Sequence, residues 1–115
     1  MQRIFCRSKI SKATITGLEL EYEGSITLPS ELLAAADMLP GERVQVVNLN
    51  NGERLETYVI EGENNGEVLL NGPAARRGYP GDRIMILAYS IGSDSEVGPP
   101  RVVEVDSSNR PTERD

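Results

Sequence analysis

The sequence of 115 residues contains no histidine, and this absence removes a large part of enzyme chemistry. Serine–histidine and cysteine–histidine nucleophile pairs, and metal sites that use histidine, all need an imidazole. The single cysteine, Cys6, can form neither a disulfide within the chain nor a thiolate metal site, and it suits a reducing cytosol. An enzyme built on this chain would therefore use Ser, Thr, Tyr, Lys, Arg, carboxylates or a cofactor, and we expect no metal.

Long apolar runs and an excess of basic residues are also missing. No stretch approaches the length of a membrane span, and arginines interrupt the first seven residues, which lack the apolar run of a signal peptide. We therefore expect a cytoplasmic protein without membrane contact. The chain has 18 acidic against 12 basic residues, a net charge of −6. This balance argues against nucleic acid as the main partner, because phosphate binding relies on clustered Lys and Arg.

Alternation of apolar and polar residues predicts a mainly β protein whose single domain spans residues 1–115. We expect strands at residues 2–10, 25–28, 43–49, 54–60, 68–70, 83–91 and 101–105, with further alternation over 13–22. A helix should open at Pro29 or Ser30 and end before Pro40, and a single helical turn should close residues 71–77. Asn-Asn-Gly at 50–52 and at 64–66 predicts two hairpin turns. The polar tail, residues 107–115, is expected to fray.

One internal repeat refines the fold. Leu39–Val46 (LPGERVQV) is echoed by Tyr79–Ile86 (YPGDRIMI), and each copy follows a short helical segment. Two such units predict a pseudo-twofold, small β-barrel with two short helices, in which closure hides strand edges.

Several polar residues are candidates for a site, although each also has an ordinary structural explanation. The Gly24-Ser25 step alone would be a turn. Lys9 and Arg54 could be solvated surface charges, and Tyr58 could be a cross-strand aromatic residue. Asn71-Gly72 could likewise be a plain turn. Their combination and order are what distinguish this chain.

That combination resembles the pyruvoyl-dependent aspartate 1-decarboxylases, a family of small bacterial enzymes. The motifs that carry the resemblance are Lys9, Thr14, Tyr22-x-Gly24-Ser25, Leu32-Leu33, Asn51-Gly52-x-Arg54-x-x-Thr57-Tyr58, Asn71-Gly72-x-Ala74-Ala75 and Gly81-Asp82. The match runs nearly without gaps from Arg3 to Tyr89 and resumes from Pro100 to Asn109. Single motifs of this kind are weak, but all of them in register are specific.

The resemblance implies a double-psi β-barrel, a homotetramer with sites between subunits, and self-cleavage between Gly24 and Ser25. The Ser25 hydroxyl would attack the Gly24 carbonyl, and a Cβ at position 24 would crowd that attack. The longer chain would then begin with a pyruvoyl group made from Ser25. Its ketone would form a Schiff base with L-aspartate, so that the α-carboxylate leaves as CO2 and β-alanine is released for pantothenate and coenzyme A. Whether cleavage needs a maturation factor stays open.

The resemblance also implies roles for individual residues. Tyr58 matches the family's proton donor, and Thr57 matches the threonine that supports cleavage. Lys9 and Arg54 match the cationic contacts to the substrate, whose two carboxylates an arginine can grip with parallel bonds. The remaining expected substrate contacts are Thr57, Asn71, Gly72, Pro73 and Ala74.

Three positions depart from the family pattern. Ser11 and Arg76 stand where many members have histidine, which could alter pH behaviour and substrate positioning. Pro73 stands where a small residue with an N–H is expected, and it removes one backbone donor. Gly72 and Ala74 are therefore better candidates for substrate contacts than Pro73.

Two other functions are alternatives. Gly24–Val44 also looks like the swapped-hairpin DNA-binding module of bacterial transition-state regulators, over about 20 residues. Such a module needs a basic surface, yet residues 25–62 hold six acids against Arg43 and Arg54, a net charge of −4. The second alternative is a scaffold with the same barrel that is never processed.

Overall fold

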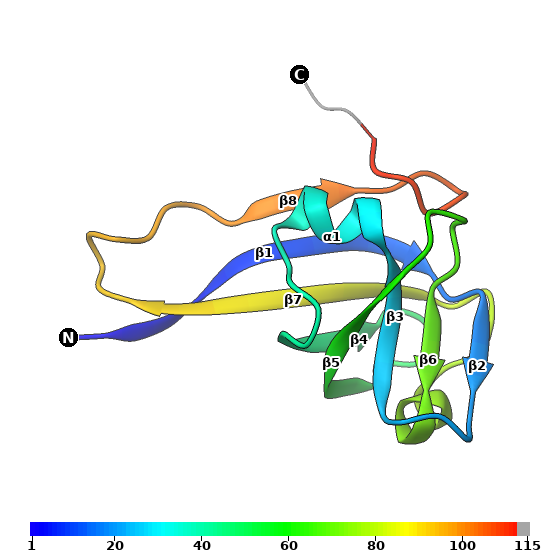
Figure 1. The fold of residues 1–115 in the computed structure, drawn as a ribbon. Coiled ribbons are helices and arrows are strands. Elements are labelled where there is room, and N and C mark those ends of the chain that lie inside the picture. Colours follow the sequence, from blue (N-terminus) through cyan, green and yellow to red (C-terminus); the bar gives the residue numbers. More distant parts are fainter. Residues whose placement is uncertain (113–115) are drawn as a thin grey trace.

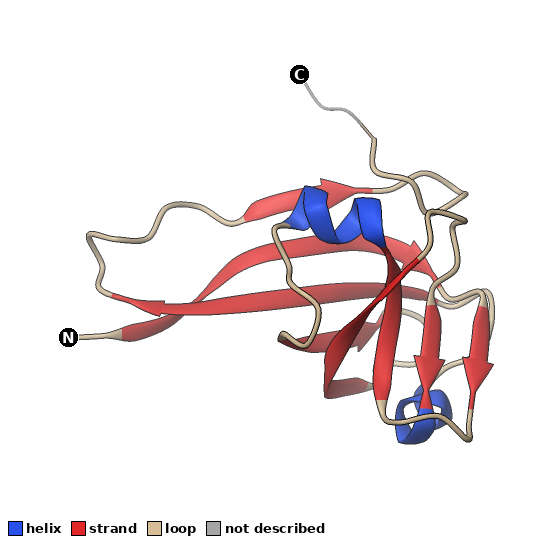
Figure 2. Ribbon diagram, in the orientation of Figure 1, coloured by secondary structure: helices blue, strands red, loops and turns tan. Residues whose placement is uncertain are grey.

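The computed structural model describes residues 1–112, and within them eight strands form one mixed sheet (Figures 1 and 2). The strands are β1 (Arg3–Thr14), β2 (Gly17–Glu19), β3 (Ser25–Pro29), β4 (Arg43–Asn48), β5 (Arg54–Gly62), β6 (Leu69–Asn71), β7 (Arg83–Gly92) and β8 (Arg101–Glu104). The two short helices of this region are α1 (Ser30–Ala36) and the 3-10 helix η1 (Gly72–Arg77). The prediction of a mainly β protein with two short helices is confirmed.

The strand order, β2-β6-β3-β5-β4-β7-β1-β8, contains the same unusual arrangement twice. β3 lies between β5 and β6, which follow one another in the chain, and β1 lies between β7 and β8 in the same way. Each triplet is a psi arrangement, with an earlier strand inserted between two consecutive later ones. Two such triplets in one sheet agree with the double-psi barrel that the resemblance implies.

This insertion overturns one prediction about a turn. The expected hairpin at 50–52 is confirmed, because β4 and β5 pair antiparallel across it and Gly52 has φ +78°. The hairpin expected at 64–66 is wrong. Ile26 of β3 pairs with Val59 on one side and with Leu70 on the other, so β5 and β6 never meet. A turn sequence specifies a reversal of the chain, but it does not say which strand fills the space beside it.

The sequence repeat is also a structural repeat. In each copy the acidic residue closes a turn onto the residue three before it: Glu42 N–H donates to Leu39 O and Asp82 N–H to Tyr79 O, both at 3.0 Å. The glycines of both turns have positive φ, +86° at Gly41 and +98° at Gly81. The strands that follow, β4 and β7, pair antiparallel. The two copies therefore sit side by side, as a pseudo-twofold fold requires.

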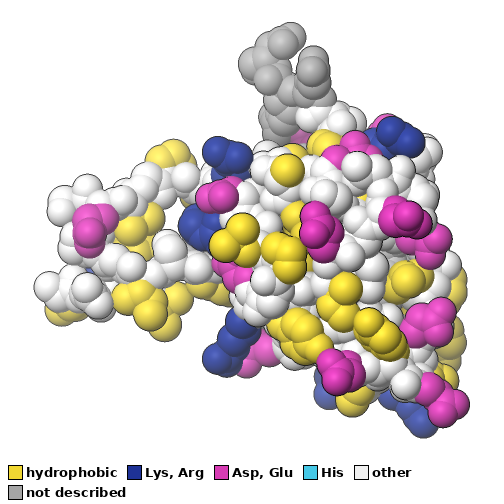
Figure 3. Space-filling view, in the orientation of Figure 1, with side chains coloured by type: hydrophobic (Ala, Val, Ile, Leu, Met, Phe, Trp, Pro, Cys, Tyr) yellow, Lys and Arg dark blue, Asp and Glu magenta, His cyan; other side chains and the backbone are white. Residues whose placement is uncertain are grey.

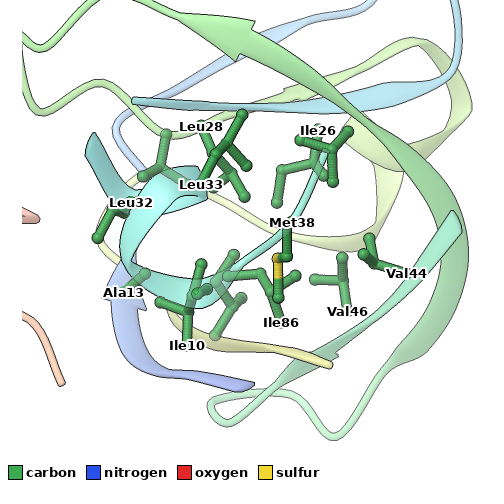
Figure 4. Packing of buried hydrophobic residues seen from close by; sticks show 14 of the residues in the cluster. Ile10, Ala13, Ile26, Leu28, Leu32, Leu33, Met38, Val44, Val46 and Ile86 are labelled. Atoms are coloured by element: carbon green, nitrogen blue, oxygen red, sulfur yellow. The ribbon is translucent and has the colours of Figure 1, made fainter. Parts of the chain in front are cut away.

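The core lies inside the curled sheet, where branched aliphatic side chains from most strands meet (Figure 4). Central members are Ile10, Ile26, Val46 and Ile86, each almost fully buried, and burial of such a side chain stabilises the fold by about 1.5–3 kcal/mol. Helix α1 covers the core with its apolar stripe Leu32, Leu33 and Ala36. It ends at Asp37, which adopts a left-handed conformation, so the predicted stop before Pro40 is confirmed.

β1 and β7 extend beyond this body as a two-stranded arm that carries the N-terminus (Figure 1). Ile4 and Ile91 are paired across the arm and are 71% and 70% exposed. Apolar side chains gather on this projection in the space-filling view (Figure 3). The arm therefore presents apolar surface that its own chain leaves uncovered.

The C-terminal segment differs from the frayed tail that we expected. Asn109 is buried, and its side chain donates to Thr14 O and Gly66 O and accepts from the Thr14 N–H, each at 2.8–2.9 Å. Thr112 N–H donates to Glu104 O at 2.9 Å, and Val105 pairs with Pro111. The expectation is thus wrong for residues 107–112, because one buried amide satisfies three backbone groups; residues 113–115 lie outside the described region. No helix within residues 1–112 is both long enough and apolar enough to cross a membrane.

Candidate active site

An open cavity of about 760 Å³ lies beside the N-terminal end of β3. Its wall is formed mainly by the segment before β3, the first half of β5 and helix η1. The lining residues are Gly24, Gln45, Arg54, Leu55, Glu56, Thr57, Tyr58, Pro73, Ala74 and Arg77. Six of the predicted site residues therefore line one cavity: Gly24, Arg54, Thr57, Tyr58, Pro73 and Ala74.

Ser25 lies just behind this wall, with a side chain that has no exposed surface. Its hydroxyl donates to the main-chain oxygen of Glu23 at 2.9 Å and accepts from the Asn71 side-chain amide at 2.9 Å. The same amide donates to the Thr27 hydroxyl at 2.9 Å. Ser25 pairs with Asn71 across β3 and β6, which explains why the two side chains meet. The Ser25 hydroxyl is thus buried, oriented and close to the Gly24–Ser25 bond.

Gly72 allows η1 to approach the same segment. It has φ +60°, and a Cβ there would stand 2.5 Å from Tyr22 O and 2.8 Å from Gly24 N. No side chain fits in that space. Pro73 follows, and its ring lies 3.3 Å from the place where a Cβ on Gly24 would stand. The backbone before the expected cleavage point is therefore packed against the start of η1.

Thr57 and Tyr58 reach the site through strand pairing. β3 and β5 are parallel with Ile26 opposite Val59, and continuing that register backwards sets Thr57 and Tyr58 beside residues 24 and 25. The Tyr58 hydroxyl donates to the Glu23 carboxylate at 3.0 Å. This hydrogen bond, followed by partial desolvation and the negative charge of Glu23, raises the pKa of Tyr58 above its ordinary value. Tyr58 therefore carries its proton at neutral pH.

Two cations line the cavity, and only one of them was predicted. Arg54 donates to the Gln45 side chain at 2.9 Å through one of its guanidinium nitrogens. Arg77, at the end of η1, forms a 3.5 Å ion pair with Glu53. Sequence reasoning missed Arg77 and also Glu23. The helical turn predicted for 71–77 was the available signal for Arg77, while Glu23 showed only as the variable position in the Tyr-x-Gly-Ser motif.

Lys9 is the predicted site residue that the chain does not bring to the cavity. Lys9 pairs with Leu87 of β7, Leu87 with Gln45 of β4, and Gln45 with Glu56 of β5. Three strand spacings separate β1 from β5, which amounts to roughly 14 Å along the sheet. Lys9 and Arg54 of one chain therefore lie on strands three positions apart in the sheet, and only Arg54 lines the cavity.

Comparison with known proteins agrees with this geometry. The family model for aspartate decarboxylase matches residues 1–112. The chain belongs to the aspartate decarboxylase family. Aspartate 1-decarboxylase of Kosmotoga olearia is 51% identical over 115 residues, covering 99% of this chain and 100% of the relative. Aspartate 1-decarboxylase 1 of Gloeobacter violaceus is 55% identical with 96% of each chain covered, and that of Dehalococcoides mccartyi is 53% identical with 92% of this chain and 88% of the relative covered.

Membership of the aspartate decarboxylase family accounts for the whole described chain. The DNA-binding regulator resembles only Gly24–Val44, a stretch that lies inside the family match. In the aspartate decarboxylase reading, Arg54, Thr57, Tyr58 and Asn71 also meet around one cavity and one buried serine, whereas the regulator reading leaves most of them without a role.

Proposed function

We propose that this chain cleaves itself between Gly24 and Ser25 and then decarboxylates L-aspartate at the α-carboxylate, giving β-alanine and CO2 for pantothenate and coenzyme A synthesis. The observation that carries the proposal is the buried Ser25 hydroxyl, which Asn71 holds directly behind a cavity lined by Arg54, Thr57 and Tyr58. The family match supports the same reaction.

Cleavage uses residues of the chain itself. The Ser25 hydroxyl would release the Glu23 oxygen that it now contacts and attack the Gly24 carbonyl, forming an ester in place of the peptide bond. Thr57, beside the bond, would supply a hydrogen bond to the oxygen that gains charge during the attack. Elimination then frees the Gly24 carboxylate, and addition of water with loss of ammonia leaves a ketone at position 25.

The surroundings of Ser25 fit the pyruvoyl group that would result. The position is buried, it lies next to the cavity, and the Asn71 amide donates to the Ser25 hydroxyl oxygen, which would leave with the Gly24 carboxylate and free this donor for the new group. Gly72 leaves no room for a side chain between η1 and the cleavage segment. Once formed, the ketone supplies an electron sink for the bond to the α-carboxylate.

The remaining side chains bind the substrate and move a proton. Arg54 would bind a carboxylate of aspartate through two of its donors. Tyr58 would donate the proton that Cα needs after CO2 leaves, because its hydroxyl stays protonated at neutral pH. Gly72 and Ala74 would offer backbone groups, and Pro73 would contribute only its ring and its carbonyl.

Lys9 would come from a neighbouring copy in a homotetramer with sites between subunits. Its distance from Arg54 along the sheet, together with the uncovered apolar arm at Ile4 and Ile91, supports this arrangement. Co-expression of Lys9→Ala and Tyr58→Phe chains tests it, since mixed assemblies would contain some sites with both native residues. Restored β-alanine formation is expected; no gain over either variant alone would contradict shared sites.

The activity itself is tested by incubating the purified chain with L-aspartate and, separately, with L-glutamate. We expect β-alanine and CO2 from aspartate, little reaction with glutamate, and none in a Ser25→Ala chain. Absence of product from a fully cleaved chain would overturn the function, whereas an uncleaved chain would favour the scaffold alternative or a missing maturation factor.

We expect no nucleic acid partner and a cytoplasmic location, and no retention on heparin at moderate salt.

A further inference from the structure

Glu23 is the acidic residue that contacts both groups of the proposed chemistry. Its main-chain oxygen accepts a hydrogen bond from the Ser25 hydroxyl at 2.9 Å, and its carboxylate accepts one from the Tyr58 hydroxyl at 3.0 Å. Neither the family motif nor the lining of the cavity assigns it a role. The contact to Tyr58 leaves that hydroxyl oriented along a fixed direction at the cavity wall.

The segment that carries Glu23 is anchored independently of the Gly24–Ser25 bond. Strand β2 ends at Glu19 and pairs with β6, and Tyr22 N–H donates back to Glu19 O at 3.3 Å. Tyr22 O also packs against Gly72 so closely that a Cβ there would lie 2.5 Å away. Glu23 directly follows this contact. Cleavage after Gly24 would therefore leave Glu23 held one residue from an anchored position.

We propose that Glu23 is a positioning residue of the decarboxylation: from the end of the short chain, its carboxylate holds the Tyr58 hydroxyl and its proton at the cavity wall, and the hydroxyl turns from Glu23 to the substrate when the proton is donated. This role rests on the proposed function, in which Tyr58 donates a proton to the substrate. Loss of the carboxylate would leave the tyrosine in place but free to rotate its hydroxyl, so that turnover falls while cleavage and substrate binding persist.

The other charged and titratable groups near Tyr58 do not replace this contact. Arg43 lies opposite Tyr58 on β4, but its Nη2 donates to both carboxylate oxygens of Glu56 at 3.0 Å. Arg54 donates to Gln45, and Arg77 pairs with Glu53. The remaining neighbour, Tyr22, contributes only a weak electrostatic effect. Glu23 is thus the carboxylate to which the Tyr58 hydroxyl is bound.

The test compares Glu23→Gln with Glu21→Gln, which removes the same charge from an exposed residue two positions upstream. Both chains are checked by intact mass for cleavage, and kcat and KM for aspartate are then measured across pH. For Glu23→Gln we expect normal cleavage, an unchanged KM and a kcat lowered roughly 3- to 10-fold, the effect of replacing a charged hydrogen-bond acceptor by a neutral one. The alkaline limb of its kcat–pH profile should move to lower pH, because the carboxylate no longer favours the protonated tyrosine.

A second measurement needs neither cleavage nor activity. In the uncleaved Ser25→Ala chain, the ionisation of Tyr58 is isolated by subtracting the ultraviolet titration of Ser25→Ala/Tyr58→Phe. Adding Glu23→Gln should move that step to lower pH, and adding Glu21→Gln should leave it unchanged. If Glu23→Gln leaves the pH of Tyr58 ionisation unchanged, the contact between Glu23 and Tyr58 is refuted, even if no chain is active. This result therefore distinguishes failure of the inference from failure of the proposed function.

Three kinetic outcomes decide the positioning role. A Glu23→Gln pH profile equal to that of Glu21→Gln overturns it. A Glu23→Gln chain that stays uncut assigns the contact to cleavage and overturns a role in turnover. A lowered kcat with a shifted alkaline limb and normal cleavage supports the role.

Discussion

The side-chain nitrogen of Asn71 lies 2.9 Å from the hydroxyl oxygen of Ser25, and neither side chain is exposed. The contact joins β6 to the first residue of β3 and fixes the proposed nucleophile before any reaction begins. A hydroxyl that is buried and held in this way cannot exchange its partner for water. The behaviour of the Gly24–Ser25 bond should therefore depend on Asn71 more than on any exposed residue of the cavity.

Asn71→Ala should slow self-cleavage by tenfold or more while the chain still folds. The change leaves the hydroxyls of Ser25 and Thr27 without their shared donor, and each unsatisfied buried group costs about 1–3 kcal/mol. The fraction of cut chain is followed by intact mass during incubation. Asn109→Ala is the matched control, because that amide is equally buried but satisfies backbone groups at the C-terminal segment. Equal cleavage rates in the two variants would contradict the role of Asn71.

Gly72→Ala should destabilise the protein more than Gly41→Ala does. Both glycines have positive φ, so an alanine at either position carries backbone strain of about 1 kcal/mol. Nothing lies within 4 Å of a Cβ at Gly41, whereas at Gly72 it would meet Tyr22 O at 2.5 Å. Urea unfolding of the uncleaved Ser25→Ala chain compares the two without interference from cleavage. Equal losses of unfolding free energy would show that the close approach of η1 to the Tyr22–Gly24 segment does not contribute to the cost of the substitution.

Tyr58→Phe should be cleaved normally and turn over poorly. The ring keeps its packing, and only the hydroxyl that donates to Glu23 is lost. Removal of a general acid lowers turnover by about 10²–10⁴-fold. Cleavage is read by mass and turnover by β-alanine formation. A variant with normal turnover would move the proton donor to another group.

The turn that ends at Asp82 should make the fold sensitive to acid. Hydrogen bonds from the Asn48 side chain, and then from the Tyr79 N–H, lower the pKa of Asp82 below its ordinary value of 3.8. A depressed pKa in the folded state stabilises the protein above the unfolded pKa, and this contribution is lost as pH falls through the folded pKa. The unfolding free energy of Asp82→Ala should therefore lie below that of the parent near neutral pH and approach it on acidification. A difference that does not depend on pH would refute the linkage.

Much of the fold could be predicted from local patterns. The 50–52 turn, the stop of α1 and the repeat around Pro40-Gly41 and Pro80-Gly81 depend on residues close together in the chain, where glycines and Asp37 adopt the positive φ that each turn or helix end needs. The 64–66 turn was misread because β3 enters from a distant part of the chain. The tail was misread because a polar residue such as Asn109 predicts exposure unless its buried partners are known.

The candidate site, too, could be predicted only in part. The types of chemistry at Ser25, Thr57, Tyr58 and Asn71 followed from the motif. The parallel register of β3 and β5 brings Thr57 and Tyr58 beside Ser25, and the antiparallel pairing of β3 and β6 brings Asn71 there. The separation of Lys9 from Arg54 could not be predicted, because it depends on the order of four strands. Glu23 and Arg77 were missed because their contacts come from segments that adjoin only in the folded chain.

Intact mass spectrometry of the purified, denatured protein tests the central claim most directly. The account predicts two species, a chain of residues 1–24 and a chain of residues 25–115 whose first residue is a pyruvoyl group that blocks N-terminal sequencing. Ser25→Ala should give one species with the mass of the whole chain. A native protein that remains a single uncut chain after prolonged warming, yet forms β-alanine from aspartate, would contradict the account.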